Sequence, residues 1–236
     1  MSNREGRTTD GFIWKQDFDT EGKTIKIMDY EGGNKDITIP SEIDGRPVTV
    51  IETGAFKGKD ITSVIIPASI NAIRYRAFED TKITSVTIPG NVKLIESDSF
   101  RNTGLNSLTL GNGIEKIERE AFANNNLTSL TIPDSITEIG LEAFINNQIS
   151  ELNIGEGLKK IERKTFENNK LTNVTIPGSV IEIGEKAFLI NQISELNLKE
   201  GIQIIEYEAF SKNNLTKVTI PESMVTLGSE VFINNL

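Results

Sequence analysis

One spacing constrains the fold of this chain more than any other feature: phenylalanine recurs every 22 residues. The column runs without a slip through Phe78, Phe100, Phe122, Phe144, Phe166, Phe188, Phe210 and Phe232. Counted from Ile61, eight units fill residues 61–236, with starts at positions 61, 83, 105, 127, 149, 171, 193 and 215. A fixed period of this length is typical of a solenoid, in which each unit forms one coil and packs only against its neighbours.

The pattern inside each unit predicts a short strand. The unit that begins at Leu127 reads Leu-Thr-Ser-Leu-Thr-Ile-Pro, so its fourth and sixth places are apolar and the places between them are polar. This alternation favours a half-buried strand, and proline ends the strand because it has no N–H for the ladder. In the same unit Ile139 and Ala143-Phe144 complete the apolar set. We expect the strands of successive coils to pair in parallel over one continuous core.

A longer period of two units is superimposed on the first. In the C-terminal part, alternate units have proline at the seventh place and glycine at the fourteenth. The proline units carry Pro133, Pro177 and Pro221 with Gly140, Gly184 and Gly228. The units between them carry Gly111, Gly155 and Lys199 with Glu118, Glu162 and Glu206. The building block of this part is therefore a pair of units, and duplication of such a pair explains the pattern.

The residues outside the regular units predict how the array is closed. An irregular unit spans Ile37 to Phe56, and two alternating segments before it, Phe12–Phe18 and Thr24–Met28, are typical of a β-hairpin. We therefore divide the chain into a disordered tail (1–9), a hairpin cap (10–34) and the array (35–236). The last coil contributes Val218, Ile220, Leu227 and Phe232 with no further coil in this sequence to cover them. This predicts self-association through residues 215–236.

Composition excludes several classes of function. The chain has no Cys and no His, which removes the thiolate nucleophile, the commonest general base and the commonest metal ligands. A net charge of -9 disfavours nucleic acid as a partner. No apolar run is long enough for membrane insertion, and the polar start predicts no signal peptide. We therefore expect no enzyme activity, no catalytic residues, no cofactor and no bound metal.

The repeat consensus, L-x-x-L-x-I-P-x-x-[VI]-x-x-I-G-x-x-A-F, resembles the BspA-type (Treponema-type) leucine-rich repeat of bacterial surface proteins. The match covers roughly residues 35–236, and the irregular segment Ile39–Ile51 is similar to the usual opening of that family. The resemblance implies a curved, right-handed α/β repeat solenoid with a parallel β-sheet on its concave face. It also implies protein binding or adhesion at the cell surface or in secreted form. The chain departs from the family where Asn replaces a frequent Cys after the Phe.

That asparagine column has two interpretations. It occupies the twenty-first place, at Asn125, Asn147, Asn169, Asn191, Asn213 and Asn235. The asparagines could bind a ligand, but the favoured interpretation is structural, because Asn amides commonly satisfy backbone groups in turns. A second column, at the twelfth place, alternates in charge through Lys116, Glu138, Lys160 and Glu182. Adjacent coils lie about 4.8 Å apart, so this column predicts ion pairs between coils.

Candidate binding residues lie at the outward third and fifth places of the strands. These places are mostly Ser and Thr up to residue 131 and change beyond residue 150. The distinctive set is Glu151, Asn153, Asn173, Thr175, Glu195 and Asn197. We expect the sheet to recognise a protein or glycan ligand through these residues, with a solubilising surface as the alternative interpretation. The rival function is a structural spacer or self-assembling stalk of a longer surface protein, and the rival fold is a parallel β-helix.

Overall fold

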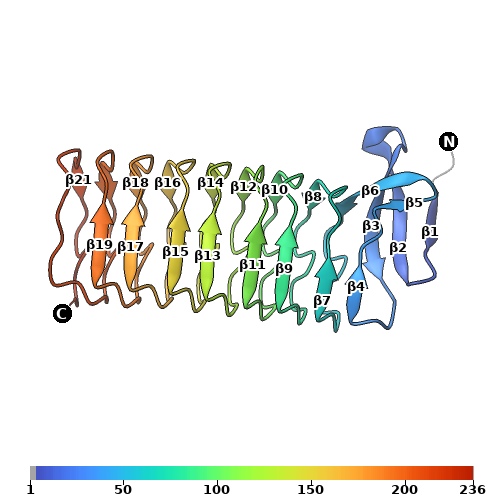
Figure 1. The fold of residues 1–236 in the computed structure, drawn as a ribbon, viewed down its shortest axis with the longest axis horizontal. Helices are drawn as coiled ribbons and strands as arrows, with labels where there is room; N and C mark the ends of the chain where they lie inside the picture. Colours follow the sequence, from blue (N-terminus) through green and yellow to red (C-terminus); the bar gives the residue numbers. More distant parts are fainter. Residues whose placement is uncertain (1–3, 236) are drawn as a thin grey trace.

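The computed structural model describes residues 4–235 and shows the expected stack of coils. Figure 1 shows the coils side by side in one row, with the N-terminal hairpin at one end and the last coil at the other. The row has no pronounced curvature in this view. We name each coil by its first residue, so that coil 127 spans residues 127–148. The contact between two successive coils is called a junction, such as the 127/149 junction.

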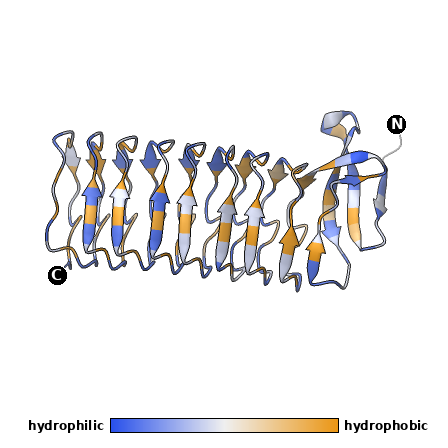
Figure 2. Ribbon diagram, in the orientation of Figure 1, coloured by the Kyte–Doolittle hydropathy of each residue, from blue (hydrophilic) through white to orange (hydrophobic). Residues whose placement is uncertain are grey.

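Each coil before the last contributes strands to two faces, and the last coil contributes a strand to the short-strand face. The long-strand face is formed at the third to sixth places by β4 (Asp36–Thr38), β7 (Ser63–Ile65), β9 (Ser85–Ile88), β11 (Ser107–Leu110), β13 (Ser129–Ile132), β15 (Glu151–Ile154), β17 (Asn173–Ile176) and β19 (Glu195–Leu198). The short-strand face is formed by β6 (Arg46–Ile51), β8 (Ala72–Ile73), β10 (Leu94–Ile95), β12 (Lys116–Ile117), β14 (Glu138–Ile139), β16 (Lys160–Ile161), β18 (Glu182–Ile183), β20 (Ile204–Ile205) and β21 (Thr226–Leu227). Figure 2 shows hydrophobic and hydrophilic bands alternating along the long strands, as expected for strands with one buried face.

The N-terminal cap joins the short-strand face. β2 (Phe12–Asp17) and β3 (Thr24–Tyr30) form the expected antiparallel hairpin around a 3-10 turn, η1 (Phe18–Thr20). β3 then pairs in parallel with β6, and β6 also pairs antiparallel with β5 (Glu42–Ile43). The structure differs from the expected tail over residues 1–9, because β1 (Glu5–Arg7) pairs with β2. Residues 1–3 lie outside the described residues.

The core is a continuous column of stacked rings. Neighbouring phenylalanines from Phe56 to Phe232 have ring centroids 4.9–6.0 Å apart and nearly parallel planes. In the cap, Phe12 and Tyr30 pack on Phe56 at 6.3 and 6.0 Å and extend the column. Trp14 is buried in the same cluster, and its ring lies so close to Gly6 that a Cβ there would be 2.8 Å away. The hairpin therefore seals the first coil with its own aromatic side chains.

The helical part of the expected α/β class is wrong. The segment around each Ala-Phe pair forms turns, and η1 is the single helical element in residues 4–235. Two residues per coil, such as Glu120 and Asn124, have positive φ angles of 53° and 57°, which interrupt any helix. The backbone donors between them also point to the next coil, since the Phe122 N–H donates to the Ala143 carbonyl at 2.9 Å. The array is a β-solenoid whose turns are tied to one another across the junctions.

The long strands pair in twos. β9 pairs with β11, β13 with β15, and β17 with β19, whereas the intervening strands are not joined within the described chain. Within each pair a seventh-place N–H closes the ladder, as when Gly155 donates to the Ile132 carbonyl at 2.9 Å. At the next junction that place is Pro177, which has no N–H to donate. The two-unit period of the sequence therefore appears as a sheet split into two-stranded pieces.

On the short-strand face the two-unit period appears as the fourteenth-place glycine, while the ladder itself is broken only between β14 and β16 within the described residues. At the junctions where the long strands are unpaired, the fourteenth-place glycine lies close to the preceding coil. A Cβ on Gly140 would lie 2.6 Å from the Arg119 nitrogen, and one on Gly184 would lie 2.8 Å from the Arg163 nitrogen. Only glycine fits so close an approach. At the 105/127 and 149/171 junctions the coils are therefore in close contact on the short-strand face, while their long strands are not paired.

Candidate functional site

The six predicted binding residues are exposed on the long-strand face. They come from three successive strands, with Glu151 and Asn153 on β15, Asn173 and Thr175 on β17, and Glu195 and Asn197 on β19. Each strand buries its fourth and sixth places wholly or partly and leaves the third and fifth places exposed. The alternating pattern therefore fixes which side chains point outward.

The structure brings four of the six residues together. Asn173 lies opposite Glu195, and Thr175 lies opposite Asn197, in the paired strands β17 and β19. Glu151 and Asn153 lie on β15, whose partner is β13 and not β17. The loose 149/171 junction therefore separates these two residues from the other four. The predicted set consists of two neighbouring groups.

A groove runs over the larger group. Its volume is about 480 Å³, and its outward lining residues are Asn173, Thr175, Ser194, Glu195, Asn197, Lys217 and Thr219. A smaller groove of about 240 Å³ opens at the 149/171 junction, between Asn153, Glu156, Thr175, Pro177 and Lys199. Glu151 lines neither groove. The smaller groove lies where β15 and β17 are not paired, whereas the larger one lies over the paired strands β17 and β19 and extends to Lys217 and Thr219 of the next coil.

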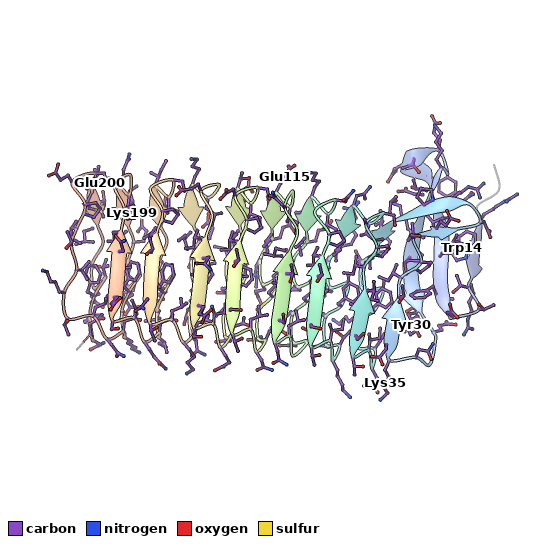
Figure 3. The ribbon with its side chains drawn as sticks, viewed as in Figure 1. Trp14, Tyr30, Lys35, Glu115, Lys199 and Glu200 are labelled. Atoms are coloured by element: carbon purple, nitrogen blue, oxygen red, sulfur yellow. The ribbon has the colours of Figure 1, made fainter. Side chains whose placement is uncertain are left out.

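Two lysines of these grooves were missed by the sequence-based prediction. Lys217 follows Glu195 in the third-place column, and Lys199 takes the seventh place that glycine or proline fills in the other regular coils. Figure 3 shows Lys199 just beyond the end of β19, beside Glu200. The third-place column itself contained the signal for Lys217, because a positive residue follows two glutamates there.

The charges of the larger groove are available for a partner. Within residues 4–235, neither Glu195 nor Lys217 belongs to an ion pair, and both side chains are exposed. By contrast, the groove on the N-terminal part of the same face has a volume of about 440 Å³ and an uncharged lining. Its exposed side chains include Ser85, Thr87 and Thr109, together with Ile65, which is 60% exposed. The two ends of the face therefore offer different chemistry.

The asparagine column is structural, as the sequence favours. Asn147 is 1% exposed, and its Nδ2 donates to the carbonyls of Phe122 and Phe144 at 3.0 and 3.1 Å. Its Oδ1 accepts from the Leu127 N–H at 3.2 Å. The same contacts recur in neighbouring coils, as in Asn169 and Asn191. These amides satisfy backbone groups of two coils at once and leave nothing for a ligand.

The described chain shows neither a metal-binding cluster nor a membrane span. No group of three or more Asp or Glu side chains in residues 4–235 is arranged to hold a metal ion. Within the same residues, no helix has the length and apolar character needed to cross a membrane.

Comparison with known proteins places the chain in a family. A family model described as a BspA type leucine rich repeat region (6 copies) matches residues 30–149 and again residues 115–236. The pneumococcal vaccine antigen PcpA has a similar fold, with a TM-score of 0.58 at 18% identity over 98% of this chain and 79% of that one. A leucine-rich repeat protein from Bacteroides ovatus gives 0.54 at 18% identity, over 99% of this chain and 91% of that one. A search of curated proteins finds no match. This chain belongs to the BspA-type leucine-rich repeat family.

Proposed function

We propose that this chain is a non-enzymatic binding module that recognises a protein or glycan at the bacterial cell surface. The observation that carries the proposal is the groove over β17 and β19. Four of the six sequence-predicted residues line it, and Glu195 and Lys217 present charges that form no ion pair within the described chain. The buried asparagine column bonds to the backbone, whereas the outward third and fifth places differ in chemistry from coil to coil.

The cell-surface location rests on family membership and on the similar fold of a vaccine antigen. A binding role also suits the architecture, because solenoid repeats present long, regular surfaces and not a single enclosed cleft. Surface charges that form no ion pair contribute to specificity when a partner supplies the opposite charge.

The test uses arrays of extracellular-matrix proteins and of glycans, followed by affinity measurement with paired variants. Replacing Glu195 with Ser and Asn197 with Thr restores the pattern of the N-terminal coils and should weaken binding by at least about tenfold. The same exchange at Glu151 and Asn153 should weaken binding less, because these residues lie across the unpaired junction. The matched control, Ser107→Glu with Thr109→Asn on β11, should leave the affinity unchanged. Unchanged affinity of the Glu195/Asn197 variant would show that the binding site lies elsewhere on the protein.

A second candidate function is a spacer that associates through its last coil. The observation that favours it is the exposure of Ile220, Val225 and Leu227, which are 40%, 77% and 48% exposed. Clustered exposed aliphatic residues are typical of contact surfaces. Sedimentation velocity over a wide concentration range tests this, and we expect association that Val225→Glu abolishes. A strict monomer at every concentration would contradict it.

A further inference from the structure

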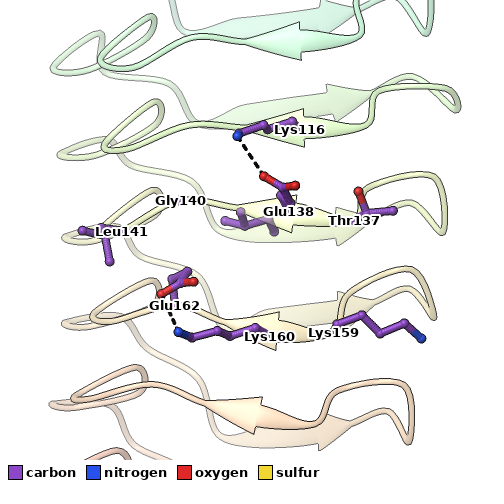
Figure 4. Close-up of a pocket in the computed structure, with 9 residues that line it drawn as sticks. Lys116, Thr137, Glu138, Gly140, Leu141, Lys159, Lys160 and Glu162 are labelled. Atoms are coloured by element: carbon purple, nitrogen blue, oxygen red, sulfur yellow. Dashed lines mark ion pairs between the residues drawn. The ribbon is translucent and has the colours of Figure 1, made fainter.

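One junction of the array is open on the short-strand face. It is the 127/149 junction, where a hollow of about 610 Å³ lies between the coils that carry β14 and β16 (Figure 4). Within the described residues, the ladder of this face runs from the cap to β14 and again from β16 to β21. The opening therefore divides the array into two blocks. The residues that line it are Lys116, Thr137, Glu138, Ile139, Gly140, Leu141, Lys159, Lys160 and Glu162.

The backbone hydrogen bonds of this face are missing at the opening. At the neighbouring 149/171 junction, the N–H groups of Ile181 and Gly184 donate to carbonyls of the preceding coil, both at 2.8 Å. The equivalent donors at the 127/149 junction are Lys159 and Glu162, and neither N–H group donates a hydrogen bond within the described residues. Because these donors lie on both sides of the short strand, the ladder is broken across the whole width of the face.

The same two coils stay in contact on their other sides. On the long-strand face, β13 pairs with β15 over four residues of each strand. At the turns around the Ala-Phe pair, the N–H groups of Glu142, Phe144 and Asn146 donate to coil 149 at 3.0–3.1 Å. In the core, the Phe144 and Phe166 ring centroids lie 5.8 Å apart, the widest spacing before the last coil. A junction that is closed on two sides and open on the third has the geometry of a hinge.

The charges beside the opening are divided between the two blocks. Glu138 pairs with Lys116 of the preceding coil at 2.8 Å, and Lys160 pairs with Glu182 of the following coil at 3.0 Å. Lys160 also contacts Glu162 of its own coil at 3.3 Å. Glu138 and Lys160 occupy the same place in neighbouring coils, but each is held by residues of its own block. An acid and a base that could pair across the junction therefore stand on opposite sides of it.

We propose that the 127/149 junction is a hinge that moves between this open state and a closed state. In the closed state, the Lys159 and Glu162 N–H groups donate to coil 127, and Glu138 pairs with Lys160 across the junction. Closing exchanges two exposed ion pairs for one and gains two backbone hydrogen bonds, and each of these contributions is small. The two states therefore differ little in free energy, and both are populated.

Closing the hinge tilts the block that ends at β14 against the block that begins at β16. The first block carries the uncharged groove that includes Ile65, and the second carries the charged groove over β17 and β19. A partner that contacts both grooves binds one state better and shifts the population towards it. The hinge itself does not rest on the proposed function, because it moves without a ligand.

Relaxation dispersion of the ¹⁵N-labelled protein detects exchange between states in the microsecond-to-millisecond range and tests the hinge without any ligand. We expect dispersion at the Lys159 and Glu162 amides, whose hydrogen bonding changes when the junction closes. The equivalent amides of Ile181 and Gly184 should show none, because the ladder at the 149/171 junction is intact.

A disulfide across the opening locks the hinge. Because the sequence has no cysteine, the variant Glu138→Cys/Lys160→Cys carries a single pair of thiols. Its oxidised form should abolish the dispersion at Glu162 and slow hydrogen exchange of that amide by at least about tenfold. Its reduced form should keep the dispersion.

The matched control is Ala72→Cys/Leu94→Cys, at the same place of two coils that the pairing of β8 with β10 already joins. Oxidation of this variant should leave the dispersion at Lys159 and Glu162 as in the wild-type protein. The proposal would be overturned if the wild-type protein showed no dispersion at these two amides, or if the dispersion persisted in the oxidised Glu138→Cys/Lys160→Cys variant. Failure of that variant to oxidise under conditions that oxidise the control would also overturn it, because the closed state brings the two positions within reach of a disulfide.

Discussion

The two faces of the solenoid are built from the same coils with the same period, but their hydrogen-bond ladders break at different junctions. Within the described residues, the long-strand face is interrupted at every second junction of the regular array, before the coils that carry Pro89, Pro133, Pro177 and Pro221. The short-strand face continues from the cap to β14, is interrupted once, and resumes at β16. A regular interruption follows from the repeat itself, whereas a single interruption marks one coil pair as different from the others.

The alternation also explains where the grooves lie. Coils approach most closely on the short-strand face at Gly140 and Gly184, and there the long strands separate. The groove at Asn153 and Pro177 lies where β15 and β17 separate, and the groove over the paired strands β17 and β19 extends to Lys217 of the next coil. An opening lined by Leu141 lies on the opposite face, where β14 and β16 are not paired. Unequal stacking of nearly equal coils therefore accompanies the hollows of this surface.

The largest expected effect comes from the core that both faces share. Phe144 is fully buried between Phe122 and Phe166, with ring centroids 5.4 and 5.8 Å away. Phe144→Ala should lower the free energy of unfolding by about 3–5 kcal/mol, because it leaves a cavity in the column. Urea denaturation measures this, with Phe18→Ala as the control, since Phe18 is 50% exposed. Equal stability of Phe144→Ala and wild type would refute the continuous core.

A smaller effect tests the tight side of one junction. Gly140→Ala places a Cβ 2.6 Å from the Arg119 nitrogen and forces coils 105 and 127 apart. We expect a loss of about 1–3 kcal/mol in urea denaturation, as for other overpacked sites. Gly33→Ala is the matched control, because a Cβ there meets no atom within 4 Å. If both variants have the same free energy of unfolding, the close approach of the coils at Gly140 is not the cause of the difference between the two faces.

The buried asparagine column should contribute to stability at every junction, whether or not the long strands are paired there. Asn147→Ala removes hydrogen bonds to buried backbone groups of two coils, and such unsatisfied groups cost about 1–3 kcal/mol. Asn146→Ala should cost less, because Asn146 is exposed and bonds to Asn124 and Asn168 on the surface. Differential scanning calorimetry compares the two variants. A larger loss for Asn146 would contradict the structural role of the buried column.

The smallest effect is a gain in stability. Ile190 has φ 56° and is 41% exposed, at a place where four earlier coils have Asn. A β-branched residue is strained in this conformation and Asn tolerates it, so Ile190→Asn should stabilise the protein by about 1 kcal/mol. Thermal unfolding measures the change. A lower melting temperature would show that the Ile190 side chain contributes packing that its exposure does not reveal.

Much of this architecture could be predicted from the sequence, because it depends on contacts that every coil repeats. The period, the stacked Phe column, the structural asparagines and the Lys116–Glu138 pair all follow from residues at fixed spacing. The turns around the Ala-Phe pair could not be predicted in this way. Apolar spacing there suits a helix equally well, and only the backbone shows that Glu120 and Asn124 adopt positive φ.

The positions of the grooves could not be predicted from the sequence either. The third-place column predicts that Asn173 and Glu195 share a face, but it assumes equal distances between coils. The unequal stacking separates Glu151 from that pair and adds Lys217 to it. The position of a break in the hydrogen-bond ladder depends on how two whole coils pack together. It therefore cannot be predicted from the residues at one equivalent place of each coil.

Native-state hydrogen exchange measured residue by residue by NMR tests the central claim most directly. Amides that close a ladder should be protected: Gly155 on the long-strand face, and Gly140 and Gly184 on the short-strand face. The Glu162 amide, at the fourteenth place of coil 149, should exchange much faster than the equivalent amides of Gly140 and Gly184. Equal protection of all three would contradict the account, because it would show that the short-strand ladder continues through the 127/149 junction.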